Sequence, residues 1–157
     1  MRLIVDFHIH SKYSRATSIN ISVENLAKYA KIKGINVLGT GDFTHPQWLK
    51  ELKAKLCALG NGLFEYDETL YVLSGEVSNV FTVEGKVKKI HDVILAPSFE
   101  ITEQINEQLK KSGILEKTKD IEDTKKNIDK LMILLEAQYE FIMNIAENNK
   151  KDLPYVS

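Results

Sequence analysis

Residues 3–10, LIVDFHIH, decide how the fold begins, because a mostly apolar run leads directly into two histidines. Residues 3–7 are largely apolar and β-branched without a helical period, which predicts a buried strand. Side chains two apart on a strand point to the same face, so His8 and His10 can present two imidazoles to one metal ion. Histidines at strand ends are also often simply hydrogen-bonded and half-buried, so both interpretations stay open for the pair alone.

The composition is that of a soluble globular protein. The chain has 157 residues, of which 43% are hydrophobic and 27% charged, with a net charge of -1. This length predicts one domain with a real core and leaves little room for a second. A net charge near zero gives the protein no overall electrostatic attraction to nucleic acid. A local basic patch is still compatible with this net charge. Charge therefore leaves the class of partner open.

The next segments predict a strand, loop and helix unit. Ser22 is suited to cap a helix over residues 23–33, and Gly34 can supply its left-handed end. Residues 35–43, INVLGTGDF, then predict a second strand that ends in a glycine-rich turn. The unit is expected to repeat from this point.

A second helix is expected to begin at Thr44 and Pro46 and to run to Gly60. Cys57 falls within it, where a small buried hydrophobe is the plain interpretation and a nucleophile would need a basic partner. A single cysteine excludes an intrachain disulfide. No signal segment and no apolar run of membrane-spanning length are found in the sequence, so we expect a cytoplasmic protein that does not bind membranes.

The later elements continue the alternation. Residues 70–78 predict a third strand that closes on Gly75 and Glu76, and residues 79–97 predict a hairpin or two strands centred on Gly85. An amphipathic helix is expected over residues 100–113. Alternating strands and helices indicate an α/β fold with a mainly parallel sheet or barrel, whose chemistry collects at the carboxyl ends of the strands.

Residues beyond these helices have a different character. Residues 116–157 contain no glycine, and a heptad pattern with Ile121, Ile128 and Leu135 at one position predicts a long helix or helix pair. Such a stripe usually packs on its own sheet or on a second copy, so we expect a helical tail and a homo-oligomer formed through it. No catalytic or ligand-binding role is predicted for this tail.

Further candidate ligands occur at comparable positions of the later strands. Asp42 and His45 follow the second strand, Glu76 ends the third, and His91 lies on the hairpin. A carboxylate at position 76 could bridge two ions, with His91 on the second ion. Two cations roughly 3.5–4 Å apart suit phosphate-ester hydrolysis, because they hold the attacking and leaving oxygens together. Singly, Glu76 and His91 are ordinary surface residues, but the joint placement favours a metal site.

Four stretches carry a resemblance to a known family: DFHIHSKYSRATS, LGTGDFTHPQWLKEL, SGEVS and IHDVILAPS. Over about residues 1–115 the chain resembles the polymerase-and-histidinol-phosphatase (PHP) domain, a family of metal-dependent phosphoesterases with a distorted barrel. It is most similar to the endonuclease Q branch, whose members nick DNA beside deaminated bases. The resemblance implies a truncated PHP-type distorted (β/α) barrel and a phosphoesterase or endonuclease that acts in DNA repair with divalent Zn, Mn or Mg.

The resemblance also implies roles for single residues. His8 and His10 match the first metal motif, Glu76 the bridging carboxylate and His91 a ligand of the second ion. Asp42 aligns with the family's catalytic-motif aspartate. His45 is a displaced candidate for the histidine that usually follows that aspartate directly.

The chain departs from the family pattern in its later part. The family completes its ion sites with a later histidine and a final Asp-x-His pair, whereas no histidine follows His91. We therefore expect only the N-terminal half of the domain, over residues 1–115, with a truncated or frame-shifted gene product as one explanation. The resemblance implies enzymatic activity, and the missing late ligands leave open an inactive half-domain as the alternative.

Several alternatives remain at this stage. Lys12 and Arg15 are candidates for holding substrate phosphates of DNA, or are solvated loop charges. Trp48 suits base stacking, but its helical spacing with leucines favours the core. The whole chain could be a non-catalytic remnant that binds metal or forms dimers. An amidohydrolase-like barrel, which also begins with His-x-His, ranks last.

Overall fold

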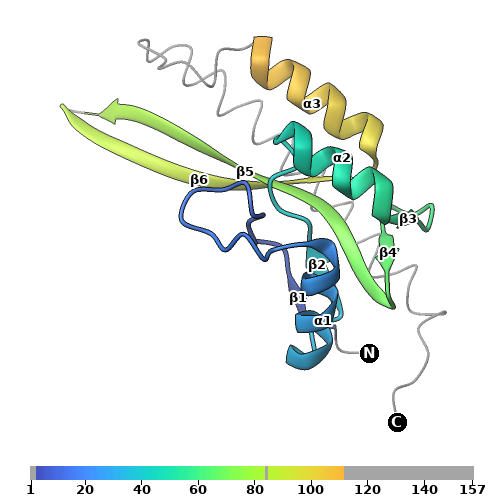
Figure 1. Cartoon of the computed structure of the whole chain (residues 1–157). Coiled ribbons are helices and arrows are strands. Elements are labelled where there is room, and N and C mark those ends of the chain that lie inside the picture. The colour runs from blue at the N-terminus through green and yellow to red at the C-terminus, as the bar shows by residue number, and fades with distance from the viewer. Residues whose placement is uncertain (1–2, 84, 112–157) are drawn as a thin grey trace.

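A computed structural model of the chain describes residues 3–83 and 85–111. The tail predicted for residues 116–157 and the boundary at residue 115 lie outside this part. In chain order the elements are β1 (Val5–Asp6), α1 (Val23–Lys33), β2 (Val37–Gly39), α2 (Pro46–Lys55), β3 (Cys57–Ala58), β4 (Phe64–Tyr66), β5 (Thr69–Val83), β6 (Lys86–Ala96) and α3 (Phe99–Lys111) (Figure 1). The α/β class expected from the sequence is confirmed.

The sheet is mixed rather than mainly parallel. Its order is β1-β2-β5-β4-β3, with β6 paired to β5. Strands β1, β2 and β5 are parallel, whereas β4 and β6 run antiparallel to β5 and β3 antiparallel to β4. Within the described residues β1 and β3 end the sheet without pairing to each other, so it is open and no closed barrel is formed.

Strand β5 is longer than expected because the sequence TLYVLSGEVSNVFTV holds no strand breaker after Gly75. Its first residues pair with β2 and β4, and from Leu73 to Val83 it pairs with β6. The outer part of this pair, residues 77–83 and 85–92, is called the β5–β6 arm below, and it projects away from the helices (Figure 1). The predicted hairpin centred on Gly85 is confirmed, with Val83 opposite Lys86.

Helix α1 begins and ends as its sequence predicts. The Ser22 hydroxyl accepts a hydrogen bond from the Asn25 N–H, and Gly34 ends the helix in the left-handed conformation at φ 68°. The helix buries Val23 and Ala27 completely, and the buried Tyr71 hydroxyl donates to the Val23 carbonyl at 3.2 Å. Caps and one apolar face therefore fix this helix against β5.

The core includes Trp48, as its helical spacing predicts. Its side chain is fully buried, and the indole N–H donates to the carbonyls of Thr40 and Gly41, both at 3.0 Å. Helix α2 thus packs on the sheet and also holds the turn after β2. Helix α3 lies beside α2, joined to it by an ion pair between Lys53 and Glu103 (Figure 1). No helix in the described ranges is long and apolar enough to cross a membrane.

The prediction that α2 continues to Gly60 with Cys57 buried in it is wrong. The helix begins at Pro46 after His45 and ends at Lys55, and Cys57 opens the short strand β3 with an exposed side chain. The chain turns back through residues 59–63, where the Leu59 N–H bonds to the Leu63 carbonyl. The Gly-Asn-Gly sequence at residues 60–62 is a hairpin signal that outweighs the helical pattern before it.

An ion pair between the first two helices predicts a small pH dependence of stability. Lys55 Nζ lies 2.7 Å from Glu24 Oε1, and this hydrogen bond is the main cause that lowers the pKa of Glu24 to about 2. Because the folded-state pKa lies below the ordinary value of 4.5, the pair stabilises the fold above that pH. The contribution is lost as the pH falls from about 4.5 toward 2, and since Glu24 is half exposed it amounts to no more than about 1 kcal/mol.

The measurement is the free energy of unfolding of the wild type and of Glu24→Gln, from denaturant titrations at several pH values. The difference between the two proteins should be largest near neutral pH and shrink below about pH 4.5. A difference that stays constant down to pH 2 would contradict the assigned role of the pair.

Candidate metal centre

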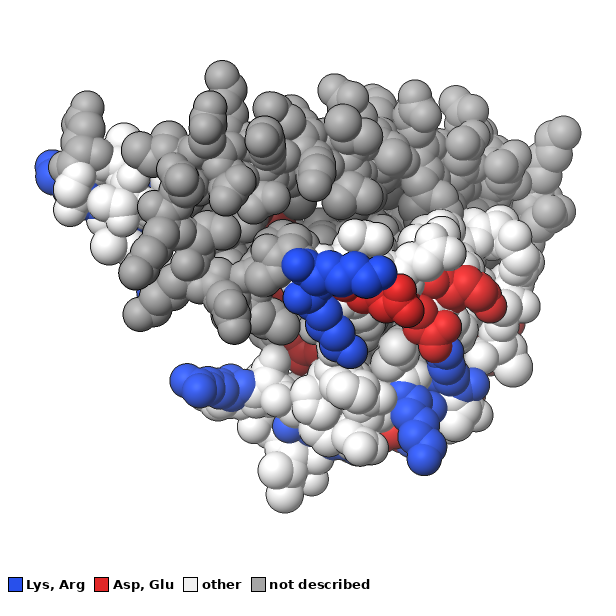
Figure 2. All heavy atoms as spheres, turned by 90° about the horizontal axis from the view of Figure 1, so that it is seen from above, with Lys and Arg blue, Asp and Glu red and all other residues white. Residues whose placement is uncertain are grey.

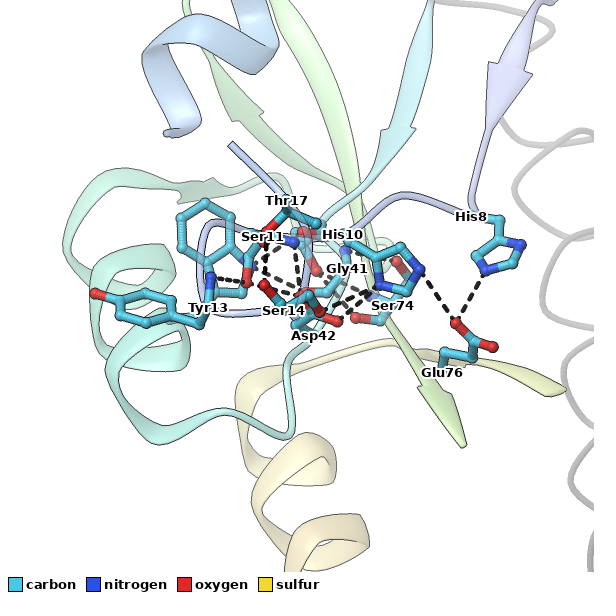
Figure 3. Close-up of polar contacts among 12 residues, drawn as sticks. His8, His10, Ser11, Tyr13, Ser14, Thr17, Gly41, Asp42, Ser74 and Glu76 are labelled. Carbon is cyan, nitrogen blue, oxygen red and sulfur yellow. Dashed lines mark hydrogen bonds and ion pairs between the residues drawn. The ribbon is translucent and has the colours of Figure 1, made fainter. Parts of the chain in front are cut away.

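Three predicted ligands converge on one point at the edge of the sheet. His8 and His10 follow β1, and Glu76 extends from β5 toward both (Figure 3). Glu76 Oε2 lies 3.1 Å from His8 Nε2 and 3.3 Å from His10 Nε2. One ligand atom from each of the three side chains lies within 4.8 Å of the others, which is close enough for a single cation to replace these contacts.

His91 lies on the opposite side of the same carboxylate. Its Nδ1 contacts Glu76 Oε1, the oxygen that faces away from His8 and His10. In the β5–β6 pairing His91 stands opposite Ser78, two residues beyond Glu76, so both side chains lie on one face of the ribbon. One carboxylate between imidazoles on both sides is the geometry that a bridging ligand requires.

Glu76 carries the negative charge of this centre. Its side chain is only 15% exposed, although His8 and His91 beside it are more than half exposed. Burial raises the pKa of Glu76, but the hydrogen bonds from His8 and His91 lower it by more, so the pKa lies below its ordinary value. The carboxylate is therefore ionised at neutral pH and available to a cation.

Two glycines bring the histidine segment close to the sheet. A Cβ atom at Gly39 would lie 2.4 Å from the Phe7 carbonyl oxygen, and one at Gly41 would lie 2.3 Å from that of Ile9. Gly41 also has φ 64°, which favours glycine. Because glycine has no Cβ atom, the backbone of Phe7 and Ile9 can pack directly against the end of β2 and the turn that follows it. The GTGD sequence was expected to form a turn, but this close approach was not foreseen.

Asp42 supports His10 instead of joining the three converging ligands. Its carboxylate accepts hydrogen bonds from the Ser11 N–H at 2.6 Å, the Ser11 hydroxyl at 2.7 Å and the Ser14 hydroxyl at 2.8 Å (Figure 3). The other oxygen lies 3.3 Å from His10 Nδ1. A carboxylate on the far nitrogen of a histidine fixes its tautomer and aims its Nε2 at the ligand site.

The surroundings keep Asp42 ionised. Burial raises the pKa of Asp42, but hydrogen bonds from Ser11, Ser14 and His10 outweigh this, and the pKa lies below its ordinary value. Asp42 also has φ 44°, in the left-handed region that an aspartate tolerates better than most residues. Neither serine was singled out from the sequence, because their spacing from Asp42 is set only by the fold.

The remaining predicted residues lie around the centre. The His45 ring stacks on Tyr13 at 4.3 Å, and His45 precedes the first turn of α2 instead of meeting the other histidines, so its catalytic role stays a prediction. Lys12 Nζ lies 2.7 Å from Glu51 Oε1, so its charge is already paired. Arg15 is exposed and forms no ion pair with any described residue, which leaves it available for an anion.

The Asp42→Asn variant should bind divalent metal more weakly than the wild type. Loss of the carboxylate removes the partner that orients His10, and loss of an outer partner of this kind typically weakens metal binding about 10–100-fold. Titration calorimetry with Zn²⁺ or Mn²⁺ measures the change. Asp67→Asn is the matched control, because Asp67 also has positive φ, at 48°, but lies in the turn between β4 and β5. Equal metal affinity in wild type and Asp42→Asn would contradict the orienting role.

Comparisons with known proteins relate the fold of this chain to DNA endonucleases. No family model matches the chain. It is 40% identical over 107 residues to the uncharacterized protein MJ0043 of Methanocaldococcus jannaschii, a match that covers 68% of this chain and 11% of that protein. In structure it is similar to the lesion-specific endonuclease PfuEndoQ of Pyrococcus furiosus, with TM-score 0.60 and 30% identity over 71% of this chain and 27% of that one.

A second solved structure is endonuclease Q in complex with a 27-mer duplex that carries an abasic lesion at the active site. Here the TM-score is 0.59 and the identity 30%, over 70% of this chain and 27% of that chain. The match thus spans about a quarter of the endonuclease chains and about a tenth of the Methanocaldococcus protein. Across that shared part, the fold of this chain is similar to that of a lesion-specific DNA endonuclease.

Proposed function

We propose that this chain carries the N-terminal part of a PHP-type, metal-dependent phosphoesterase that cleaves DNA at damaged or deaminated bases. The observation that carries the proposal is Glu76 between His8 and His10 on one oxygen and His91 on the other. Imidazole nitrogens with a carboxylate form a donor set typical of Zn²⁺ and Mn²⁺. Similarity to endonuclease Q over about 70% of this chain supports DNA as the substrate.

The proposal assigns a role to each residue of the candidate metal centre and to its neighbours. His8, His10 and Glu76 would hold one cation, and Glu76 with His91 would contribute to a second. When bound, such cations lower the pKa of a water and polarise a phosphoryl oxygen. Asp42 acts through His10 by fixing its orientation. Arg15, exposed on the loop that follows the histidines, is assigned to a substrate phosphate, whereas Lys12 is held by Glu51.

The test is strand cleavage of a duplex that contains one deoxyuridine, compared with the same duplex without it, in the presence of Mn²⁺, Zn²⁺ or Mg²⁺. We expect a nick in the damaged strand only, and no product with Glu76→Gln. Glu68→Gln is the matched control, because Glu68 is 86% exposed in the turn before β5 and should leave cleavage unchanged. Both variants remove one carboxylate charge, so a difference between them reports on position 76.

Intact damaged DNA after prolonged incubation of the metal-loaded chain would overturn the catalytic proposal. If cations still bind with the expected ligands, the second candidate applies, in which this part of the fold is a non-catalytic module that binds metal or forms dimers. The observation that favours it is the open sheet, whose end strands β1 and β3 leave unpaired edges within the described residues. Sedimentation of the same sample distinguishes a dimer from a monomer.

A further inference from the structure

Apart from His91, the β5–β6 arm supplies no residue of the candidate metal centre, and it begins directly beside that centre. Glu76 is the last β5 residue before the arm, and His91 lies within the arm on β6. From residue 77 to residue 83 the arm extends roughly 20 Å at about 3.3 Å per residue. Among the described elements β6 pairs only with β5, so within this part of the chain the arm is a two-stranded ribbon (Figure 1).

The arm carries basic side chains on both faces. Lys89 stands opposite Val80 and lies on the face that holds Glu76 and His91. Lys86 and Lys88, opposite Val83 and Phe81, lie on the other face. All three lysines are exposed, and no ion pair joins them to a described residue. Figure 2 shows blue atoms, the colour of Lys and Arg, at the far left, where the arm ends.

Apolar side chains lie between these lysines. Val87 is 65% exposed, and the other members of this group are Val80, Val83 and Ile90, each between 43% and 48% exposed. No acidic residue occurs from position 85 to position 91 of the sequence, and Glu84 and Asp92 flank this stretch. Asp92, at the base of the arm, accepts a hydrogen bond from Asn79 Nδ2 at 3.0 Å. A ribbon with a basic, partly apolar surface on both faces matches a partner that presents phosphates on two sides.

We propose that the β5–β6 arm enters a groove of the duplex DNA whose phosphodiester lies at the metal centre. The inference rests on the proposed function. The major groove of B-DNA admits a two-stranded β-ribbon and has a phosphate backbone along each wall, so lysines on both faces of the ribbon can reach phosphates. The exposed apolar side chains share these faces, with Val80 opposite Lys89 and Val83 opposite Lys86, and would pack beside the lysines against the groove walls.

The spacing along the ribbon fits the same partner. Lys89 pairs with Val80, four residues beyond Glu76, which places its backbone roughly 13 Å from that of Glu76. Phosphates of one strand are spaced by about 3.4 Å along the helix axis. Lys89 therefore reaches the backbone about four nucleotides from the cleaved bond, and Lys86 and Lys88 reach farther.

The experiment measures binding without cleavage. Fluorescence anisotropy of a labelled duplex carrying one deoxyuridine is recorded in EDTA over a range of salt concentrations. The arm variant is Lys86→Ala, Lys88→Ala and Lys89→Ala together. The control variant replaces three exposed lysines of α1 and α2, Lys28, Lys33 and Lys50, by alanine. Both variants lose three positive charges, so only the position of the charges differs.

The arm variant should bind at least about tenfold more weakly at low salt, and the slope of log K against log salt should fall by up to about 2.7, or 0.9 per lost phosphate contact. The control should change both quantities much less. Equal losses in the two variants, or an unchanged slope in the arm variant, would overturn the proposal. An unchanged slope with loss of a dimer in sedimentation would assign the arm to a second copy of the chain instead.

Failure of this inference can be told apart from failure of the proposed function. If the wild type nicks damaged DNA and the arm variant keeps the wild-type salt slope, the arm is not a DNA contact and the metal centre stands. If no nick is made but the slope falls only in the arm variant, the arm binds DNA and the catalytic proposal fails.

Discussion

Replacing Glu76 by glutamine is expected to abolish the stabilisation that divalent cations give to the folded chain. The carboxylate is the only acidic group among the three converging ligands, and its two oxygens face imidazoles on opposite sides. Removing a direct ligand costs more affinity than the roughly 100-fold upper value for an outer-shell partner. At a cation concentration 100 times Kd the wild type gains about 2.7 kcal/mol of stability, and the variant should gain almost none.

Thermal unfolding with and without Zn²⁺ or Mn²⁺ measures this effect. Glutamine has nearly the same shape as glutamate, so the metal-free variant should unfold close to the metal-free wild type. Glu68→Gln is again the matched control and should keep the full metal-dependent rise in Tm. A rise in Tm of the Glu76→Gln variant equal to that of the wild type would place the cation elsewhere.

Replacing Trp48 by alanine is expected to destabilise the fold by about 3–5 kcal/mol, the usual cost of truncating a buried tryptophan. Its side chain is fully buried, and its N–H holds the carbonyls of Thr40 and Gly41 in the turn that leads to Asp42. Loss of the ring therefore leaves both a cavity and two unpaired carbonyls. Denaturant unfolding in the absence of metal measures the loss.

Trp48→Phe separates the two contributions. Phenylalanine keeps most of the apolar volume but cannot donate a hydrogen bond, so its stability should lie between those of the wild type and Trp48→Ala. Because the turn also positions Asp42, Trp48→Phe should weaken metal binding measurably even where the protein stays folded. Wild-type stability in Trp48→Ala would contradict the core role of this residue.

Local sequence signals predicted the elements whose ends they determine. Ser22 and Gly34 limit α1 through a hydrogen-bonded cap and a left-handed end, and Gly85 lies in the turn of the β5–β6 hairpin. Strand β3 was missed because the helix expected from Thr44 was continued over Cys57 to Gly60, the first residue of the hairpin signal. The continuation of β5 past Glu76 was missed because a glycine inside a strand was taken for its end.

The candidate ligands were predicted from residue type and position, whereas their partners depend on tertiary structure. His8 and His10 were proposed from their spacing, and Glu76 and His91 from strand ends and family resemblance. That Asp42 would bind Ser11, Ser14 and His10 depends on the packing of the histidine segment against Gly39 and Gly41. No local pattern in the sequence shows a contact of this kind across more than 25 positions.

The central claim is that His8, His10, Glu76 and His91 form a metal centre, and the most direct test is equilibrium dialysis against Zn²⁺ or Mn²⁺ followed by elemental analysis. The proposed centre predicts two bound cations per wild-type chain, one in His91→Ala and one or none in His8→Ala. A chain that binds no cation, or one that binds the same number in all three proteins, would contradict the claim.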